Sequence, residues 1–397
     1  MKDVINKNLS NSSSPLGKLE GAGGIYIHIP FCKQACHYCD FHFSTSLKQE
    51  DKMLSALKVE LILRKNEMKN TTIETIYFGG GTPSILKVED IEWLISLIKI
   101  DYQVSETAEI TLEANPDDLN AEYLKALSKS SVNRLSIGIQ SFFEDDLKLM
   151  NRAHNANEAK TCLEQATQYF NNISIDLIYG IPGSTNERWI ENIDTALEFN
   201  IPHISSYALT VEPKTALEHF IKKGIIANVD DDLANEQFHI LIEKLNQNGF
   251  VHYELSNFGK EGFFSRNNSA YWQGKPYLGI GPSAHSFDGI TRGWNINNNS
   301  KYIKSILNHE LPIEIETLTV TDAYNEYVMT GLRTIWGVSL DKVERDFGKD
   351  YKSYLLNQAD IHLKNDLLYI EEDKLLVTKK GKFLSDGIAS DLFKINT

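Results

Sequence analysis

Short apolar runs rich in β-branched residues alternate with helix-like segments through the first 250 residues of this 397-residue chain, and this alternation limits the possible folds most. The strand-like runs are 25–30, 73–79, 108–114, 134–140, 173–181 and 203–210. The clearest helical patterns are 50–68, 88–99, 155–170, 185–199 and 231–248. Consecutive strand–helix units favour a parallel sheet with right-handed crossovers. Six units are too few for the eight-stranded barrel, so we predict an α/β fold with a partial (β/α)6 barrel.

The pattern changes on both sides of this region. Residues 1–23 are polar, rich in Ser, Asn and Gly, and lack the apolar stretch of a signal peptide, so we expect a disordered tail. The barrel is expected to span 24–250, with an extension over 251–310. Residues 311–397 have a different texture, and we expect a separate winged-helix-like α+β domain there.

The prediction for this last domain rests on four segments. Residues 323–335 have an amphipathic helical pattern, and a second helix is expected from about Leu340. The apolar pair 367–371 and 375–378 reads as a hairpin, and a final helix is expected after Gly381. From residue 318 onward the chain has 11 Lys or Arg against 13 Asp or Glu. Without a basic face, a packing or protein-contact role is favoured over DNA binding.

Composition excludes several classes of protein. The formal charge of −14 argues against a nucleic-acid partner, because phosphate binding needs a basic surface. No run of about 18 apolar residues is present, so we expect no direct insertion into a membrane. Four cysteines, three of them in one short stretch, do not resemble a disulfide framework. A reducing cytoplasmic setting is therefore expected.

The clustered cysteines have the spacing C-x3-C-x2-C and directly follow the first strand. Cys32, Cys36 and Cys39 would then lie at the carboxyl rim of the barrel, where active sites are built. Three interpretations are open. The thiols are buried and unreactive, or they bind zinc with His37 or His42 as a fourth ligand, or they hold a cubane iron–sulfur cluster. A cubane with three thiolates keeps one iron open to a chelating ligand.

Polar residues at the ends of the second and third strands favour a ligand pocket at the same rim. The second strand ends in FGGGTPS, in which Gly80, Gly81 and Thr82 offer close backbone approach; a plain tight turn is the alternative. Glu113, at the end of the third strand, is charged in an otherwise apolar run and needs a partner if it is buried.

Three further polar residues belong to the next two units. Gln140 ends the fourth strand and Asp176 interrupts the apolar fifth strand, which favours function over packing for both. Arg152 carries a planar guanidinium group that is suited to a carboxylate, although a surface position is the simpler interpretation. Cys162 lies within a helical pattern of another unit and is expected to be core packing.

The stretch IYIHIPFCKQACHYCDFHF resembles the radical S-adenosylmethionine (SAM) proteins, in particular the coproporphyrinogen dehydrogenase branch and its heme chaperones. The resemblance runs from Gly24 to the carboxyl terminus. It implies a [4Fe–4S] cluster on the three clustered cysteines, with SAM on the open iron. The SAM-contacting positions that it implies are Tyr26, Tyr38, Gly80, Gly81, Thr82, Glu113, Gln140, Arg152, Asp176 and Ala208.

Two features favour the chaperones over the dehydrogenases of this branch. The dehydrogenases carry a further cysteine two residues after the third, where this chain has Phe41. They also place a structured arm before the cluster, whereas only 31 residues precede Cys32 here. The resemblance thus implies heme as cargo, handed to recipient hemoproteins that include membrane-bound respiratory proteins. A dehydrogenase that decarboxylates porphyrinogen propionates is the alternative, and a zinc-stabilised binding module is the third hypothesis.

The chaperones also carry an H-N-x-x-Y-W motif associated with heme. This chain has NNSAYW, so Asn268, Tyr271 and Trp272 match while Asn267 occupies the histidine position. An amide is a poor substitute for imidazole as an iron ligand. His285, in SAHSF, is the nearest alternative ligand, although a lone histidine in an apolar segment is more often a core residue.

Overall fold

The computed structural model describes residues 20–395, so the expected tail lies outside it except for its last four residues. Twelve strands form one sheet and three form another. The strands are β1 (Glu20–Ile29), β2 (Asn70–Gly80), β3 (Val104–Ala114), β4 (Arg134–Gln140), β5 (Ile173–Tyr179), β6 (His203–Ala208), β7 (Val251–Glu254), β8 (Asn257–Gly259), β9 (Tyr277–Ile280), β10 (His285–Phe287), β11 (Thr291–Asn295), β12 (Ile313–Thr317), β13 (Val338–Ser339), β14 (Leu368–Glu371) and β15 (Lys374–Val377).

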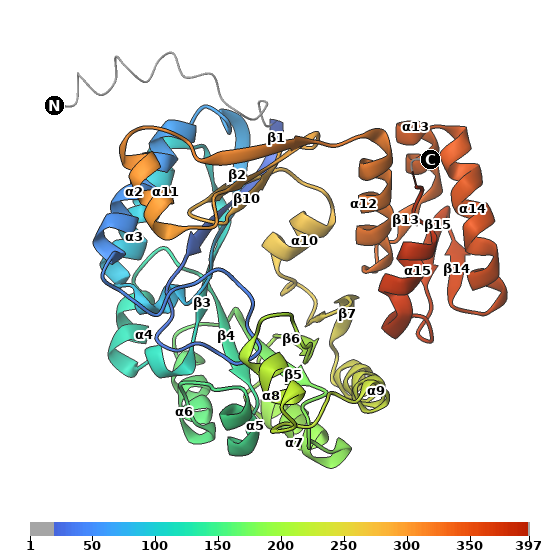
Figure 1. Cartoon of the computed structure of the whole chain (residues 1–397), viewed down its shortest axis with the longest axis horizontal. Coiled ribbons are helices and arrows are strands. Elements are labelled where there is room, and N and C mark those ends of the chain that lie inside the picture. Colours follow the sequence, from blue (N-terminus) through green and yellow to red (C-terminus); the bar gives the residue numbers. More distant parts are fainter. Residues whose placement is uncertain (1–19, 396–397) are drawn as a thin grey trace.

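The large sheet has the order β12-β11-β10-β9-β1-β2-β3-β4-β5-β6-β8-β7. Strands β1 to β6 are parallel neighbours in chain order, and β9 joins β1 in parallel. The sheet is curved and open, with helices on its outer face (Figure 1). The prediction of an α/β fold with a partial (β/α)6 barrel is confirmed.

The helices cover the barrel and build the C-terminal unit. They are α2 (Glu50–Arg64), α3 (Val88–Asp101), α4 (Ala121–Leu127), α5 (Glu144–Leu149), α6 (Ala156–Ala166), α7 (Asn186–Glu198), α8 (Ala216–Lys222), α9 (Asp231–Gln247), α10 (Arg266–Trp272), α11 (Asn299–Leu307), α12 (Val320–Leu332), α13 (Leu340–Phe347), α14 (Lys349–Lys364) and α15 (Ser385–Asp391). None of the helices in residues 20–395 combines the length and the apolar character that crossing a membrane requires.

Local sequence explains where these elements form. All seven residues of β4 are buried, as expected for a central parallel strand that is covered on both faces. Helix α6 begins with a capping box, in which the Asn155 side chain accepts from the first-turn amides and the Glu158 carboxylate accepts from the Asn155 amide. Thr319 and Asp322 form a second capping box at α12, and the Asp230 side chain accepts from first-turn amides of α9.

The structure corrects two expected boundaries. Residues 20–23, assigned to the tail, belong to β1, and their backbone pairs with residues 70–73 of β2. Their Gly-rich sequence lacks the apolar alternation of a strand. They are extended because their backbone pairs with β2. Strand β12 pairs with β11, so residues 313–317 extend the barrel sheet, whereas the C-terminal domain had been expected to begin at 311.

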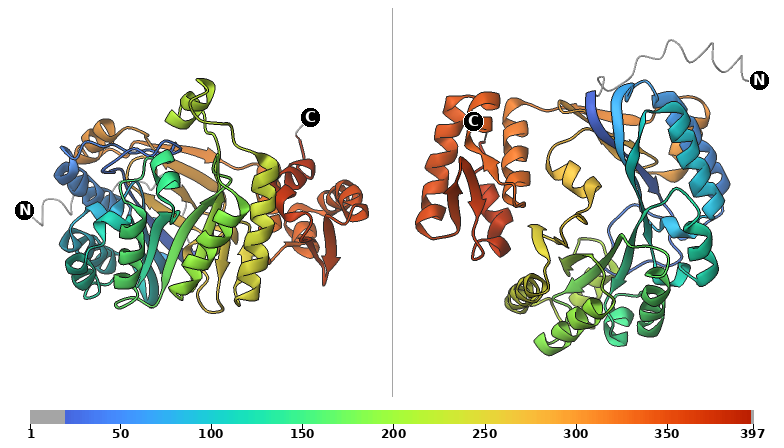
Figure 2. Two further views of the ribbon diagram at one scale, coloured as in Figure 1. Left: turned by 90° about the horizontal axis from the view of Figure 1, so that it is seen from below. Right: turned by 180° about the vertical axis from the view of Figure 1, so that it is seen from behind.

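The C-terminal unit contains α12 to α15 and the small sheet β13-β15-β14. Its hairpin and helices follow the expected winged-helix-like order, with α13 and α14 separated at Gly348. This unit has its own hydrophobic core, which includes Tyr324, Val328 and Leu355. Helix α10 lies inside the curve of the barrel sheet, on the side that faces this unit (Figures 1 and 2).

Candidate functional site

The loop after β1 carries the three clustered cysteines and is anchored to several elements. The Cys32 amide donates to the Ser44 carbonyl, and the Cys39 amide donates to the Cys36 carbonyl. His37 donates from Nδ1 to the Leu149 carbonyl at 2.8 Å. All three thiols are partly exposed and unpaired. The loop is therefore held in place while its three cysteines remain partly exposed.

Two donors from outside the loop reach the sulfurs, one just after β2 and one between α5 and α6. The Thr82 hydroxyl donates to Cys32 Sγ at 3.4 Å, and Arg152 Nη1 donates to Cys36 Sγ at 3.3 Å. Burial raises the pKa of the Cys32 thiol to about 11, and the Thr82 hydrogen bond opposes this shift. Burial also raises the pKa of Cys39 to about 11. Thiols at such sites become good ligands only when a metal displaces their protons.

Arg152 links this loop to two strand ends. Its Nη2 donates to Asn115 Oδ1 at 2.7 Å and to the Gly138 carbonyl at 2.8 Å. Asn115 in turn donates to the Thr82 hydroxyl at 3.2 Å. The Nε of Arg152 is buried, and no residue between 20 and 395 accepts a hydrogen bond from it. This donor set suits a negatively charged group beside the sulfurs.

A zinc site in this loop would require ligands that converge on one point. Within residues 20–395, no three His, Cys, Asp or Glu side chains lie close enough together to hold one metal ion. His37 is bonded to Leu149, and His42 donates from Nε2 to Asn299 Oδ1 at 2.6 Å. In a cubane cluster each thiolate binds a different iron, so the separate sulfurs fit that group better.

Removing the Arg152 guanidinium should lower the stability of the protein, because this group links the cysteine loop to two strand ends. In Arg152→Met, Asn115 Oδ1 and the Gly138 carbonyl lose their donor, and each unsatisfied polar group costs about 1–3 kcal/mol. We expect the free energy of unfolding in urea to fall by about 2 kcal/mol or more. Arg345→Met is the control, because Arg345 is exposed and pairs with the adjacent Asp346. An unchanged unfolding midpoint in Arg152→Met would contradict the supporting role.

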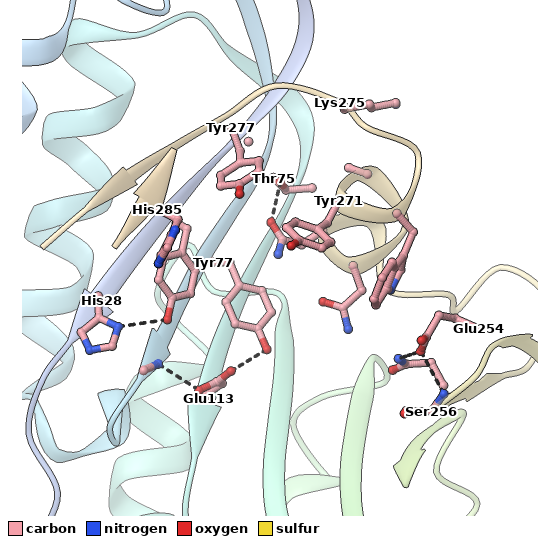
Figure 3. Close-up of a pocket in the computed structure, with 18 of the residues that line it drawn as sticks. His28, Thr75, Tyr77, Glu113, Glu254, Ser256, Tyr271, Lys275, Tyr277 and His285 are labelled. Carbon is pink, nitrogen blue, oxygen red and sulfur yellow. Dashed lines mark hydrogen bonds between the residues drawn. The ribbon is translucent and has the colours of Figure 1, made fainter. Parts of the chain in front are cut away.

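A cavity of about 760 Å³ opens beside the loop (Figure 3). Of the positions expected to contact SAM or heme, seven line it: Tyr26, Gly80, Glu113, Asn268, Tyr271, Trp272 and His285. Phe41 and His42 line it from the cysteine loop. The cavity therefore joins the ends of β1, β2 and β3 to helix α10 and strand β10.

Glu113 is the acidic centre of the strand-end wall. It accepts from the Tyr77 hydroxyl at 2.8 Å and from the Gly80 amide at 3.3 Å (Figure 3). Burial raises the pKa of Glu113 to about 7, with a smaller upward contribution from Asp176 and downward ones from its hydrogen bonds. A cationic ligand here would favour the ionised form.

The turn over residues 79–82, at the end of β2, packs against the residues of β1 and those after it, and one of its glycines lines the cavity. Gly80 has φ of 106°, and a Cβ there would meet the His28 ring. The amides of Gly81 and Thr82 donate to the carbonyls of Ile29 and Phe31. These two amides are thus committed to β1 and the residues after it, and only Gly80 of the three expected positions lines the cavity.

The remaining expected SAM positions lie near the site without lining the cavity. Gln140 is buried at the end of β4, where its backbone has φ of 67°. Its side chain and that of Arg152 both lie against Gly138. Tyr38 packs from the cysteine loop onto an apolar cluster that contains Leu147. Asp176 lies in β5, and burial raises its pKa to about 6 against the lowering effect of Arg134. Ala208 ends β6 and packs against the core.

The heme candidates come from α10 and β10. Tyr271 is half-exposed and contacts Trp272 edge-on, with ring centroids 5.3 Å apart. Asn267, at the histidine position of the motif, accepts from the Thr75 hydroxyl at 3.1 Å and so has a structural partner in β2. His285 lies across the cavity from Tyr271 (Figure 3).

Sequence reasoning missed several lining residues. Tyr77 and Thr75 lie within β2, where nothing marks them apart from ordinary strand residues. Arg333, at the end of α12, reaches the cavity, pairs with Glu254 at 3.2 Å and lies 5.0 Å from the Trp272 ring. Glu254 could have been suspected from the sequence, because it is a charged residue in the strand-like stretch YELSNF. Nothing in the sequence around Arg333 indicates a place in the cavity.

Comparison with known proteins identifies both units. The Radical SAM superfamily model matches residues 26–196, and the HemN C-terminal domain model matches 318–384. The heme chaperone HemW of Bacillus subtilis is 35% identical over 367 residues, covering 91% of this chain and 97% of that protein. The heme chaperone HemW of Lactococcus lactis is 32% identical over 371 residues, covering 93% and 97%.

Among solved structures, coproporphyrinogen III oxidase (HemN) from Escherichia coli has a TM-score of 0.82 at 23% identity, covering 99% of this chain and 93% of that one. At this identity the match establishes the fold. A Radical SAM domain implies SAM and a [4Fe–4S] cluster, which agrees with the donor set around the three cysteines. The chain belongs to the HemW family of the radical SAM superfamily.

Proposed function

We propose that this chain is a heme chaperone, which binds heme in the cavity between the strand ends and α10 and hands it to recipient hemoproteins. One observation carries the proposal: a single cavity joins the rim beside the cysteine loop to the aromatic residues Tyr271 and Trp272 and to His285. Its volume of about 760 Å³ lies within the range of roughly 300–1,000 Å³ typical of cofactor-sized sites. The HemW relatives, named heme chaperones, support the same function.

The proposal assigns the cluster to Cys32, Cys36 and Cys39, and SAM to the adjoining rim. The cluster, when bound, supplies an open iron for the amino and carboxylate groups of SAM. Glu113 and the Gly80 turn are proposed to hold the cationic part of SAM, because Glu113 is the acidic group of that wall. Thr82 and Arg152 orient the loop and donate to its sulfurs. Tyr38, Gly81, Gln140, Asp176 and Ala208 are proposed to support SAM binding from around the cavity.

The exposed side chain of Phe41 supports the chaperone over the dehydrogenase. Phe41 lines the cavity and is 70% exposed, at the position where the dehydrogenases carry a further cysteine. An apolar ring at the mouth suits the face of a porphyrin. Recipient hemoproteins, among them membrane-bound respiratory proteins, remain part of the proposal.

The two activities are separated by one paired assay. Protein that contains the cluster and one bound heme should pass the heme to an apo-hemoprotein such as apomyoglobin. The transfer is detected by the appearance of the acceptor's own heme spectrum. The same protein with SAM and a strong reductant, without oxygen, should leave coproporphyrinogen III unchanged. Decarboxylated product in the second assay, with no transfer in the first, would favour the dehydrogenase.

A further inference from the structure

Among the three imidazoles that line the cavity, His285 differs from His28 and His42 in the hydrogen bonds of its ring. His28 donates from Nε2 to the His42 carbonyl at 2.9 Å, and its Nδ1 therefore accepts from the Tyr26 hydroxyl at 3.2 Å. His42 donates from Nε2 to Asn299. Within residues 20–395, neither ring nitrogen of His285 has a hydrogen-bond partner, although its ring lies 6.0 Å from that of Trp294. Only His285 thus offers both nitrogens to a ligand.

The backbone of His285 is fixed by the strand beside it. A Cβ on Gly279 of β9 would clash with the His285 carbonyl, so the close approach of β9 and β10 depends on that glycine. The next residue, Ser286, is buried, and its hydroxyl oxygen accepts from the Gly279 amide at 2.9 Å and from Arg64 Nη2 at 3.1 Å. A ligand on such a support keeps its direction when the metal binds.

Arg64 itself is locked in place. It is fully buried in α2, pairs with Glu60 at 3.2 Å and Glu67 at 2.9 Å, and donates to the Gly279 carbonyl at 2.9 Å. A buried ion pair of this kind is weak evidence for added stability. Its effect here is to tie α2 to the β9–β10 hairpin and so to the backbone that carries His285.

The surroundings of His285 match the rest of a heme molecule. Tyr271 and Tyr277 contribute aromatic rings to the same cavity, with ring centroids 5.7 Å apart. Arg292 and Lys275 also line it; Arg292 pairs with Glu326 and Lys275 with Glu74 at 3.5 Å. Both pairs are partly exposed, so the propionate carboxylates can compete for these cations. Arg292 lies on β11, opposite Phe287 of the β10 strand that carries His285.

We infer that His285 is the axial ligand through which this chain holds heme iron, with the porphyrin against the aromatic residues of α10 and β9. The inference rests on the proposed function and names the ligand within it. Asn267 then needs no role at the iron, since its carboxamide is committed to Thr75.

The test is an anaerobic hemin titration of cluster-reconstituted protein, followed by resonance Raman and EPR spectra of the bound heme. His285→Gln keeps a polar side chain of similar size and removes the imidazole. We expect the Kd of this variant for hemin to rise at least about tenfold and the histidine-ligation signature to disappear. Loss of a residue that only hydrogen-bonds a metal ligand already costs about ten- to a hundredfold in affinity. In His285→Gly, added free imidazole should restore that signature.

His309→Gln is the matched control, because His309 is an exposed histidine that does not line the cavity, and this variant should keep the wild-type Kd and spectrum. His42→Gln tests the cavity imidazole that has one ring nitrogen engaged, and its bound heme should keep the histidine-ligation signature. An unchanged spectrum in His285→Gln, or loss of ligation in His42→Gln alone, would overturn the inference while the wild type still binds heme. A wild-type chain with no saturable binding would instead overturn the proposed function.

Discussion

Cys36→Ala is expected to lower the iron and sulfide content of anaerobically reconstituted protein from about four each per chain to near zero. A cubane held by three thiolates has no protein ligand to spare, and Cys36 also receives the Arg152 hydrogen bond. The loop has backbone anchors at Cys32 and Cys39 that do not involve this thiol. The fold should therefore persist while the cluster is lost, as circular dichroism beside the iron and sulfide assays would show.

Cys162→Ala supplies the matched control. Cys162 is buried in α6 and packs in the main hydrophobic core, away from the cysteine loop. Its replacement should leave iron and sulfide at the wild-type level. Full iron in Cys36→Ala, or equal losses in both variants, would contradict the assignment of the cluster to Cys32, Cys36 and Cys39.

Glu113→Gln is expected to weaken SAM binding by about ten- to a hundredfold, because a hydrogen bond to a charged group contributes roughly 1.5–3 kcal/mol. The wild type should also bind SAM more tightly as pH rises. With a pKa of about 7, Glu113 is about one-tenth ionised one unit below that pH and mostly ionised one unit above it. The SAM Kd, measured by isothermal titration, should fall about tenfold from pH 6 to pH 8.

The sign follows from which form binds. The ionised carboxylate attracts the cation, so affinity is lost as pH falls through the raised pKa of Glu113. The groups that face it are Tyr77, which donates to it, and Asp176 and Arg134, whose charges raise and lower its pKa respectively. The slope should be much flatter in Glu113→Gln, although Asp176, whose pKa burial raises to about 6, still titrates in this range. Equal slopes in both proteins would contradict the role of Glu113.

The sequence predicts best what is encoded locally. The spacing of Cys32, Cys36 and Cys39 and the apolar strand before them place the loop at the barrel rim without any long-range information. The burial of β4 and the helical period of α9 are likewise written in consecutive residues. These elements agree with the expectation to within a few residues.

What the sequence does not reveal depends on contacts between distant residues. The bond from Arg152 to Cys36 spans 116 positions, and the one from Thr75 to Asn267 spans 192. Strand β12 has an alternating pattern, but only its pairing with β11 makes it part of the barrel sheet. Arg333 joins the cavity because the end of α12 packs beside β7. No local pattern specifies such partners.

The central claim is that the cavity binds heme, and a hemin titration of the cluster-reconstituted chain without oxygen tests it most directly. We expect a saturable Soret change that ends at one heme per chain and persists in the presence of SAM. A linear, unsaturated response equal to that of an unrelated protein of similar charge would contradict the account.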